Sequence, residues 1–192
     1  MLLSRSVAKI VLPMLVFSAL PAAAQSSQPR RTLDVPYLPT TEDAVPEMLK
    51  LAKVKSTDIL YDLGCGDGRI VIAAAKTYGA HGVGIDLNPD RIREANENAR
   101  KAGVENLVRF EENDLFKADI HEATVVTLFL LNTVNMRLRP KLLRELKPGT
   151  RIVSNTFKMG DWTPDQEMSV QGVAENAPFS RKLFLWVVPQ AK

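Results

Sequence analysis

The sequence predicts an α/β fold, a Rossmann-like three-layer sandwich built on a mostly parallel seven-stranded sheet. From Asp58 onward, apolar runs of strand length alternate with segments whose apolar residues recur at helical spacing. Such alternation is typical of parallel sheets, because parallel strands are joined by crossovers that place helices on both faces. The last two expected strands have no helix between them, so we expect them to form an antiparallel hairpin at the sheet edge.

The elements can be placed along the chain in order. A first helix is expected to end at about Lys53, with Thr40 or Thr41 as its N-cap. The expected strands are 58–63, 81–86, 107–111, 123–131, 150–157, 168–174 and 182–189. The helices between the first five strands are expected at 67–78, 88–102 and 134–147.

The N-terminal segment has the pattern of a secretory signal. Arg5 and Lys9 form a basic start, residues 10–20 are mostly apolar, and small residues lead to a cleavage site after Ala24. The alternative is an uncleaved membrane anchor, which would be the protein's only membrane association. The predicted organisation is a signal peptide, a polar lead-in and one domain, at residues 1–24, 25–34 and 35–192.

Composition argues against a nucleic acid partner, an internal disulfide and a metal site. The 192 residues carry a net charge of +3, and without the leader 23 basic residues face 22 acidic ones. This balance does not favour a nucleic acid partner. Cys65 is the only cysteine, so it has no partner for an internal disulfide, and His81 and His121 are isolated, so we predict no metal site.

The stretch from Ile59 to Arg69 reads I-L-Y-D-L-G-C-G-D-G-R, a strand, a glycine turn and the start of a helix. Such a turn lets the backbone approach a ligand closely. Dinucleotide loops need a glycine where Arg69 stands, and Asp67 at the helix start would repel a phosphate. S-adenosylmethionine has no phosphate and is cationic, so the loop favours this cofactor. The loop residues expected to contact it are Asp62, Gly64, Cys65 and Gly66.

Two further acids follow the next two strands. Asp86 ends the second strand and is followed by Leu87; a carboxylate there can accept both ribose hydroxyls. Asp114 follows the third strand and can accept from an adenine amino group, while Leu115 packs on the ring. The alternative for both acids is that they only cap helices or form turns.

These motifs carry a resemblance to a known family. The order D-L-G-C-G-D-G, then G-I-D, then N-D-L resembles the seven-stranded class I S-adenosylmethionine-dependent methyltransferases. Y-L-P-T ahead of the glycine loop, with E-L-K-P-G-T-R-I-V-S later, is similar to the small protein-lysine methyltransferases that include the mitochondrial enzyme acting on the ATP synthase c-subunit. The resemblance implies that Asp62 holds the methionine end of the cofactor. It also implies that residues 37–40 cover the cofactor and line the acceptor channel, although Tyr37 could instead staple the first helix.

The end of the fourth strand departs from the motif of many amine methyltransferases. Residues 130–133 read L-L-N-T and supply Asn132 without a carboxylate or a proline pair, which argues against a nucleobase or glutamine acceptor. Asn132 can orient an amine but cannot take its proton. Phe157 and Trp162 are either an aromatic acceptor rim or part of the core. We therefore expect methyl transfer to a protein lysine; the alternatives are a small-molecule or lipid-associated acceptor, or a non-catalytic cofactor-binding protein.

Overall fold

The computed structural model describes residues 38–170 and 182–190. The predicted signal peptide, the lead-in and Tyr37 lie outside these residues. The helices are α1 (Ala44–Leu51), α2 (Arg69–Tyr78), α3 (Pro89–Ala102) and α4 (Asn132–Glu145). The strands are β1 (Ile59–Leu63), β2 (His81–Asp86), β3 (Val108–Glu112), β4 (Val125–Leu128), β5 (Arg151–Asn155), β6 (Gln166–Ser169) and β7 (Lys182–Val187).

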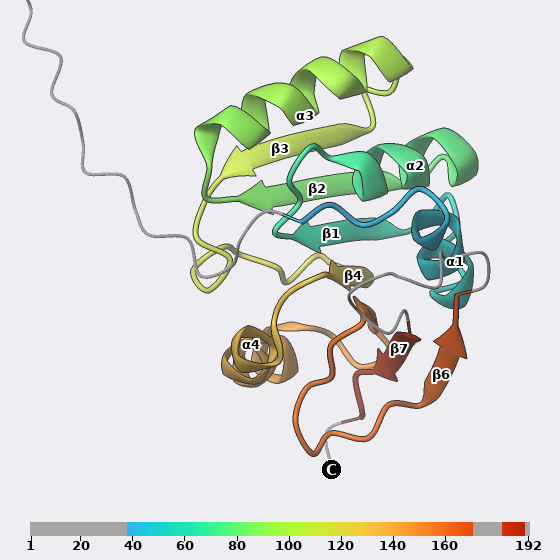
Figure 1. The fold of residues 1–192 in the computed structure, drawn as a ribbon, viewed down its shortest axis with the longest axis vertical. Coiled ribbons are helices and arrows are strands. Elements are labelled where there is room, and N and C mark those ends of the chain that lie inside the picture. The colour runs from blue at the N-terminus through green and yellow to red at the C-terminus, as the bar shows by residue number, and fades with distance from the viewer. Residues whose placement is uncertain (1–37, 171–181, 191–192) are drawn as a thin grey trace, which may run out of the picture. The chain divides into compact units, whose positions relative to one another are not determined.

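All seven strands form one sheet in the order β3-β2-β1-β4-β5-β7-β6. The first five are parallel, and β7 is antiparallel to both β5 and β6. Figure 1 shows the arrowheads of β1, β2 and β3 pointing the same way. The predicted mixed sheet is therefore confirmed. Strands β1 to β3 extend the sheet in one direction, and β4 and β5 extend it from β1 in the other. The strand order therefore reverses between the neighbours β1 and β4, and ligands of α/β folds bind at such a switch point.

Successive residues of a strand point to opposite faces of the sheet, and here both faces carry apolar side chains that helices bury. Leu60 packs in the cluster that contains the buried faces of α1 and α2, and α3 in turn contacts α2. Tyr61 and Leu63 pack on the opposite face, in the cluster that contains the buried face of α4. These two clusters form the core of the predicted three-layer sandwich.

Several element boundaries differ from the predictions, among them the starts of α1, α4 and β6 and the end of β4. Helix α1 has Asp43, not a threonine, at its N-cap, and the first two helical N–H groups bond to the Thr41 carbonyl instead. The fourth strand ends at Leu128, three residues before the expected end, because Leu131 becomes the extended N-cap of α4. Asn132 is therefore the first residue of a helix. Strand β6 begins at Gln166, two residues early, and its predicted last residues lie outside the described ones.

Candidate active site

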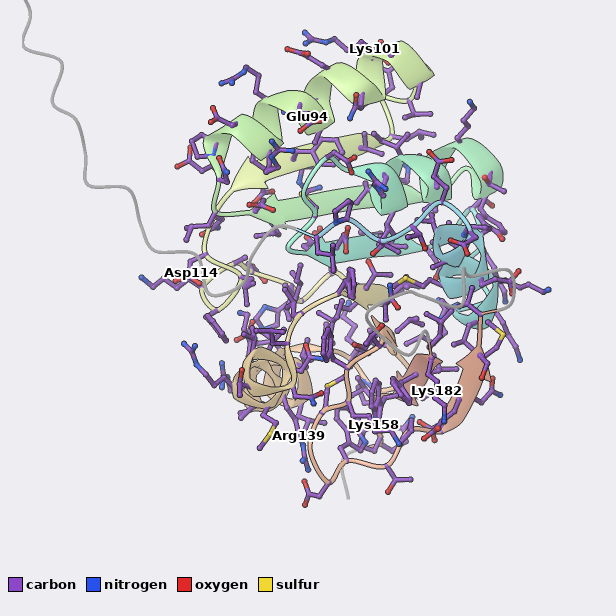
Figure 2. All side chains as sticks on the ribbon, viewed as in Figure 1. Glu94, Lys101, Asp114, Arg139, Lys158 and Lys182 are labelled. Carbon is purple, nitrogen blue, oxygen red and sulfur yellow. The ribbon has the colours of Figure 1, made fainter. Side chains whose placement is uncertain are left out.

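A pocket opens at the carboxyl ends of β1, β2 and β3, beside the switch point. Asp62, Asp86 and Asp114 all line it, one from each strand end. Asp114 lies on the side of the molecule toward which the arrowheads of these strands point (Figures 1 and 2). The three acids expected to contact the cofactor are thus brought to one cavity, together with Gly64, Cys65, Gly66, Leu87 and Leu115.

The glycine loop presents its backbone to this pocket. Gly64, Gly66 and Gly68 have φ values of 88°, 52° and 80°, a region that side-chain-bearing residues rarely adopt. The N–H groups of Gly64 and Cys65 donate to the Ile85 carbonyl at 2.8 and 2.9 Å, which ties the loop to β2. A Cβ atom at Gly64 would come within 3.0 Å of Leu130, another lining residue. Glycine at this position therefore avoids both the strain of a positive φ and a clash with Leu130.

Asp86 is fixed by backbone donors on both of its oxygens. Oδ2 accepts from the Gly66 N–H and Oδ1 from the Asn88 N–H, each at 2.9 Å. Each carboxylate oxygen can accept more than one hydrogen bond. The Asp86 carboxylate thus forms a local turn and retains lone pairs toward the pocket, and the two roles predicted for it are compatible.

Asp114 also takes part in a local turn. Its Oδ1 accepts from the Phe116 N–H at 3.0 Å, and its own N–H donates to Asn113 Oδ1 at 2.8 Å. These bonds form the turn that follows β3. The side chain still lines the pocket next to Leu115, where an acceptor oxygen and an apolar surface suit a heteroaromatic base.

Asp62 is the most buried of the three acids, with 3% of its surface exposed. Its pKa is raised to about 7, mainly by burial and also by the nearby charges of Asp86 and Asp67, while the Thr127 hydroxyl lowers it by donating to Oδ1 at 2.8 Å. Thr127 faces Asp62 in the register of β1 and β4. Sequence reasoning missed Thr127; its one signal is a hydroxyl within the apolar run V-V-T-L.

Asp67 lines the pocket, and its charge is paired with that of Arg69. Arg69 Nε and Nη2 donate to its two oxygens at 2.9 and 2.5 Å. Burial alone would raise the pKa of Asp67, but these bonds and the Arg69 charge hold it below its usual value. The same guanidinium donates through Nη1 to the Thr40 carbonyl at 2.7 Å. Arg69 thereby anchors Thr40, which lines the pocket together with Leu38 and Pro39.

An apolar part of the lining comes from the end of β4 and the start of α4, while Asn88, Arg91 and Asn113 add polar groups elsewhere. Phe129, Leu130 and Val134 line the pocket there. Asn132 is exposed and does not line the pocket; its Oδ1 accepts from the Lys158 N–H at 2.9 Å. The catalytic roles expected of Asn132 and of Tyr37 stay predictions.

A family model described as the ANTKMT methyltransferase domain matches residues 62–166, which include the strand ends, the loop and all three acids. The chain belongs to this methyltransferase family. A protein-lysine N-methyltransferase from Saccharolobus islandicus is 47% identical over 159 residues, covering 82% of this chain and 96% of that protein. An ATP synthase c-subunit lysine N-methyltransferase from Xenopus laevis is 37% identical over 70% of this chain, which spans 59% of that enzyme.

Solved structures of methyltransferases share the fold. An RNA methyltransferase from Salinibacter ruber, in complex with S-adenosyl-L-homocysteine, is 50% identical with a TM-score of 0.75, covering 81% of this chain and 96% of that one. A methyltransferase from Thiobacillus denitrificans, at 22% identity and a TM-score of 0.55, shares the fold alone. The resemblance inferred from the motifs is confirmed: this is an S-adenosylmethionine-dependent methyltransferase.

Proposed function

We propose that this methyltransferase modifies lysine side chains of a protein. The observation that carries the proposal is the 47% identity to a protein-lysine N-methyltransferase over nearly the whole of that relative. The name of the Xenopus laevis relative, which also acts on a protein lysine, supports the same acceptor class.

The residues of the pocket fit the cofactor. Bound S-adenosylmethionine supplies a methyl group already activated by a sulfonium. Asp62 places a buried carboxylate beside the loop, where it favours a cationic ligand, and Asp86 and Asp114 offer acceptor oxygens to a ribose and a base. Phe129 and Leu130 keep water from the apolar wall. Alignment and exclusion of water can contribute roughly 7–11 kcal/mol, so a base at the end of β4 is not required for the transfer itself.

The Salinibacter ruber relative is named an RNA methyltransferase, and RNA is therefore the competing acceptor class. The near balance of basic and acidic residues beyond the leader does not favour a polyanionic substrate. The end of β4 also lacks the proline pair typical of nucleobase-modifying enzymes. Both observations favour a protein acceptor.

A labelling experiment tests the acceptor class. The purified protein is incubated with methyl-labelled S-adenosylmethionine and, separately, with soluble proteins, membrane proteins, total RNA and lipids of the source cells. We expect label in protein, recovered as methyllysine after acid hydrolysis, and less label with the Asp86→Ala variant at subsaturating cofactor. Label in RNA, lipid or a small molecule would replace the proposal. Tight cofactor binding with no S-adenosylhomocysteine formed in any fraction would contradict it.

We propose further that residues 1–24 direct export and are removed. The proposal rests on the basic start, the apolar run and the small residues before Gln25. Among the residues that the structure describes, no helix is both long and apolar enough to cross a bilayer. Mass spectrometry of the mature N-terminus from fractionated cells tests the proposal. A new N-terminus near Gln25 supports cleavage, whereas an intact Met1 in the membrane fraction indicates an anchor.

A further inference from the structure

Two phenylalanines follow β4 and β5, the two strands that come next in the sheet after β1, on the side away from β2 and β3. Phe129 follows β4, and Phe157 is two residues beyond the end of β5. Their rings stack with centroids 6.2 Å apart and an interplanar angle of 26°, and both side chains are half-buried. Phe129 lines the cofactor pocket, and Phe157, which does not line it, stacks on the Phe129 ring.

The backbone that carries the Phe157 ring is held by two elements. Ser154 Oγ and Asn135 Nδ2 donate to the Phe157 carbonyl at 2.7 and 3.2 Å. The next N–H, that of Lys158, donates to Asn132 Oδ1 at 2.9 Å. Strand β5 and the first turn of α4 therefore fix the peptide group that follows the ring.

The turn before Phe157 is strained. Thr156 has a φ of 68°, a region that β-branched residues avoid. Its N–H donates to the Lys182 carbonyl at 2.7 Å and its hydroxyl to Asn155 Oδ1 at 3.0 Å, so the surroundings hold this conformation. Asn135 Oδ1 is buried and has no hydrogen-bond partner among the described residues. Strain and an unpaired buried oxygen both cost stability, and they are found where a structure sacrifices stability to position a functional group.

We propose that Phe129 and Phe157 form the wall of the site that receives the acceptor lysine, and that Asn132, Asn135 and Ser154 are positioning residues for Phe157. The inference rests on the proposed function. Phenylalanine faces attract alkylammonium groups, and the methylenes of a lysine pack on the same apolar surface. Asn132 acts in this arrangement through the peptide between Phe157 and Lys158, not by contacting the amine.

A pair of ligands that differ only in charge tests the wall. The full chain is saturated with S-adenosylhomocysteine and titrated calorimetrically with N-acetyl-trimethyllysine amide, and then with its neutral carbon isostere. We expect the parent to prefer the cation, and Phe157→Leu to bind it about tenfold more weakly while binding the isostere nearly as before. Phe157→Tyr keeps the ring face and should bind as the parent does.

Phe116→Leu is the matched control. Phe116 is also half-buried and, like Phe157, does not line the pocket, but its side chain packs against the core on the α4 side, with Arg137 4.4 Å from its ring centroid. This variant should bind both ligands as the parent does. The proposal is overturned if the parent binds neither ligand, if it binds both equally, or if Phe157→Leu and Phe116→Leu behave alike. The affinity for S-adenosylhomocysteine serves as the check that each variant is folded.

A double-mutant cycle tests the positioning role of Asn132. Asn132→Ala should weaken binding of the trimethyllysine probe in the parent background but add little in the Phe157→Leu background, because both changes disturb the same contact. Fully additive effects would show that Asn132 acts independently of Phe157. Methyllysine formation that persists without any dependence of probe binding on Phe157 would overturn this inference alone. Label found only in RNA would overturn the proposed function.

Discussion

At the residue scale, Asp62 makes the stability of the protein depend on pH. Its carboxyl group is buried, and the strongest lowering effect on its pKa comes from one hydroxyl, that of Thr127. The folded-state pKa of about 7 lies above the ordinary value of 3.8. The folded protein therefore keeps a proton that the unfolded chain releases, and the stability this proton gives is lost as the pH rises toward 7.

Asp62→Asn should make the empty protein more stable at neutral and alkaline pH. The amide oxygen can still accept from Thr127 but never ionises, so its advantage over the parent should grow between about pH 4 and pH 7 to a few kcal/mol. Thermal unfolding without cofactor across this range measures the effect. A constant difference between the two proteins would show that Asp62 is not the titrating group.

The same substitution should weaken cofactor binding, because a cationic ligand favours the ionised carboxylate. In the parent, the affinity for S-adenosylmethionine should rise by up to about tenfold for each unit by which the pH increases toward 7, and the dependence should disappear in the variant. Calorimetric titrations at three pH values suffice. Parallel pH profiles for parent and variant would remove Asp62 from the cofactor site.

At the element scale, Arg69 joins the glycine loop to the segment from Leu38 to Thr40, which lines the pocket. Arg69→Met removes the bonds to Asp67 and to the Thr40 carbonyl while keeping the aliphatic stem. We expect S-adenosylhomocysteine to dissociate several-fold faster, and amide hydrogen exchange at residues 38–41 to increase. Arg100→Met, an exposed change on α3, is the control. Unchanged exchange at these residues would contradict the coupling.

The opposite end of the sheet is joined by a second arginine. Arg151 forms an ion pair with Asp58 and donates to the carbonyls of Ala52 and Lys53 at 2.7 and 3.0 Å, linking β5, β1 and the end of α1. Asp58 also accepts from the Thr124 hydroxyl at 2.8 Å. Burial raises the pKa of Asp58, but its hydrogen bonds and the Arg151 charge lower it overall, so this stability is lost as the pH falls through acidic values.

Arg151→Met leaves the buried Asp58 carboxylate without its cation. We expect a loss of about 2 kcal/mol in the free energy of unfolding, measured with denaturant at neutral pH, and a smaller loss near pH 3. Arg93→Met removes an ion pair to Asp90 in which both side chains are largely exposed, and should cost less than about 0.5 kcal/mol. Equal losses for the two variants would show that burial of Asp58 is unimportant.

At the scale of the whole molecule, the sheet and the three acids could be predicted because both follow from local patterns. The carboxyl ends of parallel strands meet at one edge, so Asp62, Asp86 and Asp114 had to converge once the alternation was seen. The partners of Thr127 and Asn132 could not be predicted. The contact of Thr127 depends on the register of β1 and β4, and that of Asn132 on how residues 156–158 fold back toward α4. Neither feature produces a periodic pattern in the sequence.

The central claim is that carboxylates at strand ends beside a glycine loop bind the cofactor, and Asp86 tests it most directly. Calorimetric titration of S-adenosylhomocysteine into the parent, Asp86→Ala and the exposed control Asp90→Ala is the measurement. We predict at least about tenfold weaker binding for Asp86→Ala, since it removes a hydrogen-bonding charged group, and parental affinity for Asp90→Ala. Equal affinity of all three proteins would contradict the account.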